Sequence, residues 1–322
     1  MDEVAMVQLS RFPIHDASSP EQAELAARIL LLKNEMNAII VSHNYQRPEV
    51  QDVADFVGDS LELSRRCAQE KDVDVIVFCG VHFMAETAKI LNPKRTVLLA
   101  ERSAGCPMAD MIDVDDLREW KARYPKAAVV CYVNTTAAVK AECDVCCTSA
   151  NALKVVEAVP ADEILFVPDQ HLARFVASQT KKRIIAYPGY CVTHLRLKPE
   201  HIKRAKEAYP DAPVVVHPEC ASEVADLADA VLSTSQMTRY VKESPAKTFI
   251  IGTEAGIVYR MQKENPDKTF YVASTALFCP NMKRTTLRKV LETMEQRRNA
   301  IEVPEDIRLR AKRALDRMLE LV

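Results

Sequence analysis

The sequence predicts an α/β protein made of three similar small α/β sandwich domains in a pseudo-threefold arrangement around a central active site. Segments rich in β-branched residues alternate with helix-like segments along the 322 residues, a pattern typical of parallel sheets. Four strand-like segments recur with a period of about 87 residues, which indicates an internal repeat. Polar residues also follow equivalent strands in one shared register.

Twelve segments are expected to form strands, four in each repeat. They end near His43, Gly58, Cys79, Ala100, Tyr132, Cys147, Val167, Ala186, His217, Ser233, Ile251 and Val272. We expect the first domain to comprise residues 21–105 plus 280–322, the second 106–190 and the third 191–279. Amphipathic helices around 287–294 and 307–321 are expected to pack back onto the body with a solvated basic face.

The register of the repeat is set by three groups of polar residues. Within each group the members are separated by 89 and then 85 residues. The groups are His43, Tyr132 and His217; Tyr45, Asn134 and Glu219; and Ser60, Ser149 and Thr234. Since ligands bind at the carboxyl ends of strands in open α/β sheets, we expect these side chains to converge on one site.

Composition excludes several classes of protein. The net charge of −2 argues against a general nucleic-acid binder, and no apolar run approaches the roughly 20 residues that cross a bilayer. Only six glycines are present, and they form neither a GxGxxG nor a GxxxxGK motif. With an acidic start at residues 1–4 that does not resemble a signal peptide, we expect a soluble, cytoplasmic protein without nucleic-acid or membrane partners.

The strand-end residues suggest proton transfer and anion recognition. Residues two apart on extended backbone point to the same side, so each His-x-Tyr, Tyr-x-Asn or His-x-Glu pair presents two polar groups together. The hydroxyls Ser60, Ser149 and Thr234 each open a helix-like segment. Taken singly, each is interpreted as an ordinary helix N-cap. Taken together, they favour a substrate that carries carboxylates or a phosphate, because helix N-termini attract anions.

Ten cysteines in a reduced cytosolic chain indicate metal binding, catalysis or packing. The Cys143-x-x-Cys146-Cys147 spacing lacks the second pair that a zinc ribbon needs, so we interpret it as packing. Three other cysteines lie beside glycine or proline at the seams between repeats: Cys106, Cys191 and Cys279. Three converging thiolates would suit a 4Fe–4S cluster with one iron open to substrate, acting as a Lewis acid.

These residues resemble the quinolinate synthase family, the iron–sulfur enzymes of de novo NAD biosynthesis. The matching blocks follow in the same order over about 240 residues, which makes the resemblance specific. They are SHNYQ at 42–46, VGDSL at 57–61, GVHFMAETAK at 80–89, YVNTT at 132–136, TSANA at 148–152, PDQ at 168–170, PGYC at 188–191, HPEC at 217–220, STSQM at 233–237, IGTE at 251–254 and CPNMK at 279–283.

The resemblance implies an enzyme that condenses iminosuccinate with dihydroxyacetone phosphate, releasing quinolinate, phosphate and two waters. L-aspartate oxidase or aspartate dehydrogenase would supply the imine. It implies that one 4Fe–4S cluster is held by Cys106, Cys191 and Cys279, and that Tyr45 and Glu219 transfer protons. The implied substrate contacts are His43, Ser60, Tyr132, Asn134, Ser149, His217, Glu219 and Thr234, with Met84 and His194 lining the same cavity.

Two other functions stay open at this point. An iron–sulfur hydro-lyase would use the open iron to remove water from a single hydroxy acid. A non-catalytic iron–sulfur sensor would not need polar residues converging from three strand ends.

Overall fold

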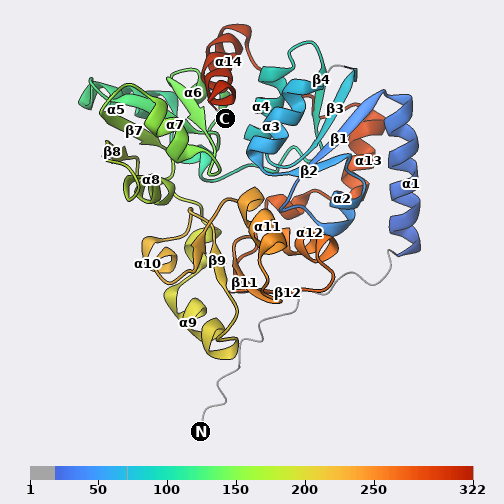
Figure 1. Cartoon of the computed structure of the whole chain (residues 1–322). Coiled ribbons are helices and arrows are strands. Elements are labelled where there is room, and N and C mark those ends of the chain that lie inside the picture. The colour runs from blue at the N-terminus through green and yellow to red at the C-terminus, as the bar shows by residue number, and fades with distance from the viewer. Residues whose placement is uncertain (1–18, 71, 322) are drawn as a thin grey trace.

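Three four-stranded parallel sheets organise the part of the chain that the computed structural model describes, residues 19–70 and 72–321 (Figure 1). The acidic segment at residues 1–4 lies outside the described residues. Within these residues, no helix combines the length and the apolar character that crossing a membrane requires.

The first sheet and its helices come from the N-terminal part of the chain. Their elements are α1 (Pro20–Glu35), β1 (Ala38–His43), α2 (Pro48–Asp52), β2 (Phe56–Gly58), α3 (Ser60–Gln69), β3 (Val75–Cys79), α4 (His82–Leu91) and β4 (Thr96–Leu99).

The second and third sheets repeat this alternation, each after a short 3₁₀ helix. The second set is η1 (Ala109–Met111), α5 (Val114–Arg123), β5 (Ala128–Tyr132), α6 (Ala137–Lys140), β6 (Val145–Cys147), α7 (Ala152–Ala158), β7 (Glu163–Val167), α8 (Gln170–Ala177) and β8 (Arg183–Ala186). The third is η2 (His194–Arg196), α9 (Pro199–Ala208), β9 (Val214–Val216), α10 (Ser222–Ala225), β10 (Ala230–Val231), α11 (Thr234–Glu243), β11 (Thr248–Gly252), α12 (Ile257–Glu264) and β12 (Thr269–Val272). The chain then forms η3 (Met282–Arg284), α13 (Leu287–Gln296) and α14 (Glu305–Glu320).

All three sheets have the same strand order. It is β2-β1-β3-β4, then β6-β5-β7-β8, then β10-β9-β11-β12, with every neighbouring pair parallel. The predicted fold class is confirmed, and the described strands end at or within two residues of the predicted positions. The boundaries proposed between the three domains stay a prediction.

In each repeat an aspartate at the same position hydrogen-bonds the backbone of a central strand. Asp55, Asp144 and Asp229 each precede the second strand of their unit, and they are spaced by 89 and 85 residues, as the strand-end groups are. Their carboxylates accept hydrogen bonds from the backbone N–H groups of Ile40, Val129 and Val214, at 2.8, 2.7 and 2.7 Å. Each bond satisfies an N–H near the start of the central strand, where the ladder leaves it free.

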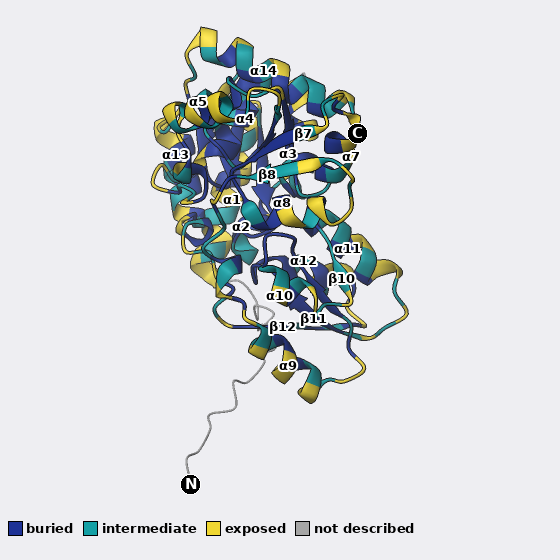
Figure 2. Cartoon of the chain, turned by 90° about the vertical axis from the view of Figure 1, so that its left-hand side faces the viewer, coloured by how far each residue is buried: buried dark blue, intermediate teal, exposed yellow. Residues whose placement is uncertain are grey.

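Helices cover the sheets and join them. α1 and α13 pack together on one face of the first sheet, where Ile29, Val290 and Leu291 meet Ile40 and Val77 in an apolar cluster. α14 packs against β6, α6 and α4, so the last helix bridges the first and second sheets (Figure 1). Strands are largely buried while the outward faces of the helices are exposed (Figure 2). The two C-terminal helices therefore pack on the body, as predicted.

Candidate active site

A central cavity lies where the carboxyl ends of the three sheets meet. The space within it that a water-sized molecule can reach is about 80 Å³. All twelve predicted site residues line it: His43, Tyr45, Ser60, Cys106, Tyr132, Asn134, Ser149, Cys191, His217, Glu219, Thr234 and Cys279. Met84 and His194 line it as well. The structure thus brings the predicted residues together, while their individual roles stay predictions.

Two strand-end histidines are locked in the same way by the local backbone. The N–H of Tyr45 donates to His43 Nδ1 at 3.1 Å, and the N–H of Glu219 donates to His217 Nδ1 at 3.3 Å. Each neutral ring therefore carries its proton on Nε2, and His217 Nε2 lies 3.2 Å from Ser149 Oγ. Burial lowers the pKa of both rings to about 3, so they are neutral hydrogen-bond donors at neutral pH.

A continuous chain of hydrogen bonds links the two predicted proton-transfer residues. Tyr45 Oη lies 2.6 Å from Thr253 Oγ1, which lies 2.8 Å from His194 Nε2. His194 Nδ1 lies 2.7 Å from Glu219 Oε2, and the phenol of Tyr132 donates to Glu219 Oε1 at 2.5 Å. Hydroxyl, imidazole and carboxylate are thus aligned as in a hydrolase triad, with a phenol at each end.

Within this hydrogen-bonded series, the local electrostatics leave one group as a base and another as an acid. Burial raises the pKa of Glu219, but the imidazoles of His217 and His194 and the hydrogen bonds from His194 and Tyr132 outweigh it, and the pKa falls below its ordinary value. Burial, reinforced by the charge of Glu219, raises the pKa of the Tyr45 phenol well above 10. Glu219 is therefore an anion and Tyr45 a proton donor at neutral pH.

The helix N-cap interpretation of the three hydroxyls is wrong. Asp59 caps α3 through the N–H groups of Leu61 and Glu62, and Ser233 caps α11. α7 begins after Asn151, two residues beyond Ser149. The preceding side chain caps α3 and α11, and no side chain caps α7. Ser60, Ser149 and Thr234 line the cavity instead.

One buried acceptor in the cavity has no partner among the described residues. Asn134 Oδ1 is shielded from solvent and receives no hydrogen bond there. A buried amide oxygen without a donor is costly, unless a ligand supplies one.

The three seam cysteines sit in three equivalent turns. The carbonyl groups of Cys106, Cys191 and Cys279 accept from the N–H four residues on, at 3.2, 3.0 and 3.2 Å. The backbone N–H groups three residues on, of Ala109, His194 and Met282, act to lower the pKa of the three thiols. These donors stabilise thiolates, which fits a cluster held by three cysteines. Burial, reinforced by neighbouring acidic groups, raises the pKa of all three thiols, that of Cys106 to about 12, so a bound cation would favour their ionised form.

A second set of potential metal ligands shares one of these cysteines. Atoms of Cys191, His194 and Glu219 all lie within 4.8 Å of one another. The 2.7 Å between His194 Nδ1 and Glu219 Oε2 is a hydrogen-bond distance, whereas two ligands on a tetrahedral zinc would be about 3.3 Å apart. The geometry of this set fits the proton chain better than a metal.

Comparison with known proteins places these features in a family. The family model described as "Quinolinate synthetase A protein" matches residues 27–320. The chain is 57% identical to the quinolinate synthase of Dehalococcoides mccartyi strain 195 over 92% of this chain and 98% of that protein. It is 59% identical to that of Thermodesulfovibrio yellowstonii over 91% and 97% of the two chains. The chain belongs to the quinolinate synthase family. A more distant member, quinolinate synthase 1 of Methanosarcina acetivorans, is 53% identical over 93% of this chain and 98% of that protein.

The resemblance to the quinolinate synthase family is therefore confirmed. Two residues of this family member were outside the predicted site set: Glu254, which lines the cavity, and Thr253, which hydrogen-bonds Tyr45 and His194. They follow β11, whereas the residues that follow the equivalent strands β7 and β3 are Pro168 and Gly80. Because these positions do not share a polar residue, the repeat did not predict Thr253 or Glu254.

The burial of two cysteines agrees with the packing interpretation of the 143–147 group. Cys146 and Cys147 are fully buried in β6, and Cys143 donates through Sγ to the carbonyl oxygen of Val139 at 3.1 Å.

Proposed function

We propose that this chain is a quinolinate synthase that condenses iminosuccinate with dihydroxyacetone phosphate, releasing quinolinate, phosphate and two waters. Family membership and the small size of the cavity support this reaction. The observation that carries it is the hydrogen-bonded chain from Tyr45 through Thr253 and His194 to Glu219. Condensation, dehydration and ring closure each need a proton moved to or from the substrate. The hydrogen-bonded residues can move protons in both directions.

Cys106, Cys191 and Cys279 would hold a 4Fe–4S cluster. When bound, this cluster supplies an iron without a cysteine ligand, a Lewis acid for an oxygen of the substrate. The backbone donors at the three sulfurs support the assignment.

Both substrates are anions, and neutral donors would bind them. His43 and His217 present Nε2–H groups, and Ser60, Ser149 and Thr234 present hydroxyls. The first turns of α3 and α11 add the positive end of the helix dipole. The amide of Asn134 and the phenol of Tyr132 complete the recognition set, and the buried Asn134 oxygen would accept a hydrogen bond from the substrate imine or a hydroxyl.

Proton transfer would run along the chain of hydrogen bonds. As an acid, Tyr45 gives its proton to a leaving hydroxyl of the substrate. As a base, Tyr45 first passes that proton to Thr253 Oγ1, whose own proton moves to His194 Nε2. Glu219 stabilises the resulting imidazolium at 2.7 Å, as the carboxylate of a hydrolase triad does.

The test is anaerobic purification followed by iron and sulfide analysis, with an assay for quinolinate from both substrates. We expect about four irons per chain and product only when dihydroxyacetone phosphate is present. Cys106→Ser, Cys191→Ser and Cys279→Ser should each lose iron and activity. Cys143→Ser is the matched control, because its thiol is half-buried but lies outside the cavity and its hydroxyl can donate to the same carbonyl. Turnover of a single hydroxy acid would support a hydro-lyase instead, and a cluster without any turnover would support a sensor.

A further inference from the structure

A buried ion pair lies beneath the proton chain, between the first and third sheets. Glu254 follows Thr253 at the end of β11, and Lys283 lies in η3 after Cys279. The side chains of Glu254 and Lys283 are 1% and 8% exposed, and Lys283 Nζ lies 2.8 Å from Glu254 Oε1. Burying two charges is costly, so a pair kept here needs a reason beyond stability.

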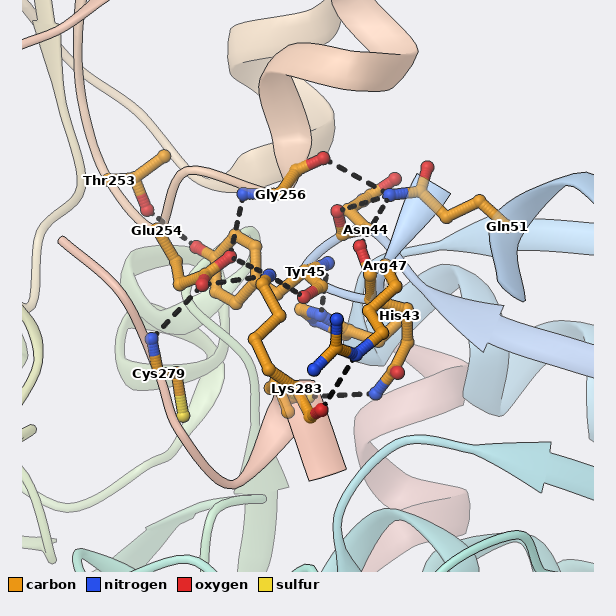
Figure 3. A network of polar contacts seen from close by, with 12 residues as sticks. His43, Asn44, Tyr45, Arg47, Gln51, Thr253, Glu254, Gly256, Cys279 and Lys283 are labelled. Atoms are coloured by element: carbon orange, nitrogen blue, oxygen red, sulfur yellow. Dashed lines mark hydrogen bonds and ion pairs between the residues drawn. The ribbon is translucent and has the colours of Figure 1, made fainter. Parts of the chain in front are cut away.

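The carboxylate of Glu254 is occupied by donors from three places in the chain (Figure 3). The N–H of Cys279 donates to Oε1 at 3.0 Å, and the N–H of Gly256 donates to Oε2 at 2.8 Å. Lys283 Nζ completes the set at 2.9 Å from Oε2. With both oxygens used, Glu254 has little capacity left for a substrate, although it borders the cavity.

The ammonium group of Lys283 extends this contact to the proton donor. Its Nζ also donates to the backbone oxygen of Tyr45 (Figure 3). The backbone oxygen of Lys283 accepts from Arg47 Nε at 2.8 Å, two residues beyond Tyr45. The loop that carries Tyr45 is therefore tied at two points to the turn that begins at Cys279.

A third bridge crosses the same seam. Gln51 Nε2 donates to the backbone oxygens of Asn44, Gln46 and Gly256, at 3.1, 3.0 and 3.1 Å. A Cβ added at Gly256 would lie 2.8 Å from the Tyr45 oxygen and 2.6 Å from Lys283 Nζ. Glycine is needed here because the two loops approach too closely for any side chain.

We propose that the Glu254–Lys283 pair is a clamp of positioning residues, which holds Tyr45 and Cys279 at a fixed separation across the seam between the first and third sheets. The clamp sets where the phenol stands relative to the thiolate of Cys279. Its catalytic consequence rests on the proposed function, but its structural consequence does not.

Hydrogen–deuterium exchange of the anaerobically purified protein tests the clamp directly. In Lys283→Met we expect amides in segments 43–47 and 276–281 to exchange at least about tenfold faster, because their local opening is no longer opposed. Lys268→Met is the matched control. Lys268 is also 8% exposed and donates to the carbonyl groups of Val241 and Ser244, but it precedes β12, at the far end of the same sheet. Wild-type exchange rates in both segments of Lys283→Met would overturn the proposal.

The double variant Glu254→Gln/Lys283→Met separates positioning from simple stability. Without an unpaired buried charge, its unfolding midpoint should recover relative to either single variant. Its exchange should stay fast, and its kcat should stay about 100-fold below wild type with KM little changed, because Tyr45 is no longer held in place. Recovery of exchange and kcat together with the midpoint would reduce the pair to a structural role. A wild-type protein that makes no quinolinate would remove the proposed function alone, since exchange still reports on the clamp.

Discussion

At the scale of the residue, the surroundings of each polar side chain decide its chemistry. Tyr45 and Tyr132 are both buried phenols that hydrogen-bond into the same chain, but their partners differ. Tyr132 donates to the anion Glu219, so its proton is held by a carboxylate. Among the described residues, the hydrogen-bond partner of the Tyr45 phenol is the neutral hydroxyl of Thr253, through which its proton can pass toward His194.

Under the proposed function, Tyr45→Phe should therefore stop turnover and leave the proposed 4Fe–4S cluster in place. We expect kcat to fall by about 10²- to 10⁴-fold, the usual contribution of a positioned acid or base. Iron and sulfide content should match wild type, since the lost hydroxyl hydrogen-bonds Thr253 and not a cysteine among the described residues. A fully active Tyr45→Phe enzyme would remove Tyr45 from proton transfer.

Thr253 gives a sharper test, because a conservative replacement exists. Thr253→Val removes the hydroxyl that joins Tyr45 to His194 while keeping the shape of the side chain, and kcat should fall by about 100-fold. Thr253→Ser keeps the hydroxyl and should retain most of the activity. Equal kcat values in the two variants would mean that protons do not travel through this oxygen.

The sequence was informative about residues that repeat and silent about those that do not. Three polar groups in register predicted the strand ends, and the structure brings those residues around one cavity. Thr253, Glu254 and Lys283 act through contacts that cross between units, and such contacts leave no trace in local spacing. The N-cap role failed for Ser60 because α3 begins one residue earlier than expected, so that Asp59 stands at the cap and accepts from the N–H groups of Leu61 and Glu62.

At the scale of the element, the loop before the first cysteine is anchored to a helix from the far end of the chain. Glu101 accepts from the N–H and the hydroxyl of Ser103, at 2.8 and 2.6 Å, and pairs with Lys289 of α13. Burial raises the pKa of Glu101, but these partners outweigh it and lower the pKa from 4.5 to about 2. The folded state thus binds this proton less readily than the unfolded state does.

The anchor should show in the pH dependence of stability. A carboxylate whose pKa is depressed on folding stabilises the protein above its unfolded pKa, and this contribution is lost as the pH falls. The unfolding midpoint of wild type should exceed that of Glu101→Gln above pH 4.5, and the gap should narrow between pH 4.5 and about 2. Thermal unfolding of both proteins across this range measures it. A gap independent of pH would mean that the charge of Glu101 contributes nothing.

Strand positions were predictable, but strand order was not. Alternation and β-branched runs mark where strands lie, whereas the order β2-β1-β3-β4 depends on pairing between segments that the sequence does not label. The spacing of Asp55, Asp144 and Asp229 matches the repeat. Carboxylates are common in loops, so this spacing alone does not show that they hydrogen-bond the central strand.

At the scale of the whole molecule, one apolar cluster runs through all three sheets. Ile76 of the first, Phe166 of the second and Phe249 of the third belong to it, and so does Leu315 of α14. The placement of α14 on the second sheet could not be read from its sequence, because an amphipathic helix shows which face is buried but not against what.

This continuity predicts that the protein unfolds as a unit. Leu315 is fully buried, so Leu315→Ala should lower the free energy of unfolding by about 2–5 kcal/mol. Fluorescence of Trp120, the one tryptophan in the sequence, reports on the second sheet, and far-ultraviolet circular dichroism reports on all three. The unfolding transitions seen by the two signals should shift together. Leu309→Ala is the control, because Leu309 on the same helix is 51% exposed. Transitions that separate in Leu315→Ala would mean that the sheets unfold independently.

The joining of three similar units in one chain bears on symmetry. Were three identical copies of one unit to enclose such a cavity, each strand end would carry the same side chains. With the same side chains in each third of the cavity, a ligand would bind equally in all three. Fusion into one polypeptide lets each third vary independently, and the strand ends here are His-Tyr, Tyr-Asn and His-Glu. Two unlike molecules can then be held in a defined mutual orientation inside a frame that still repeats three times.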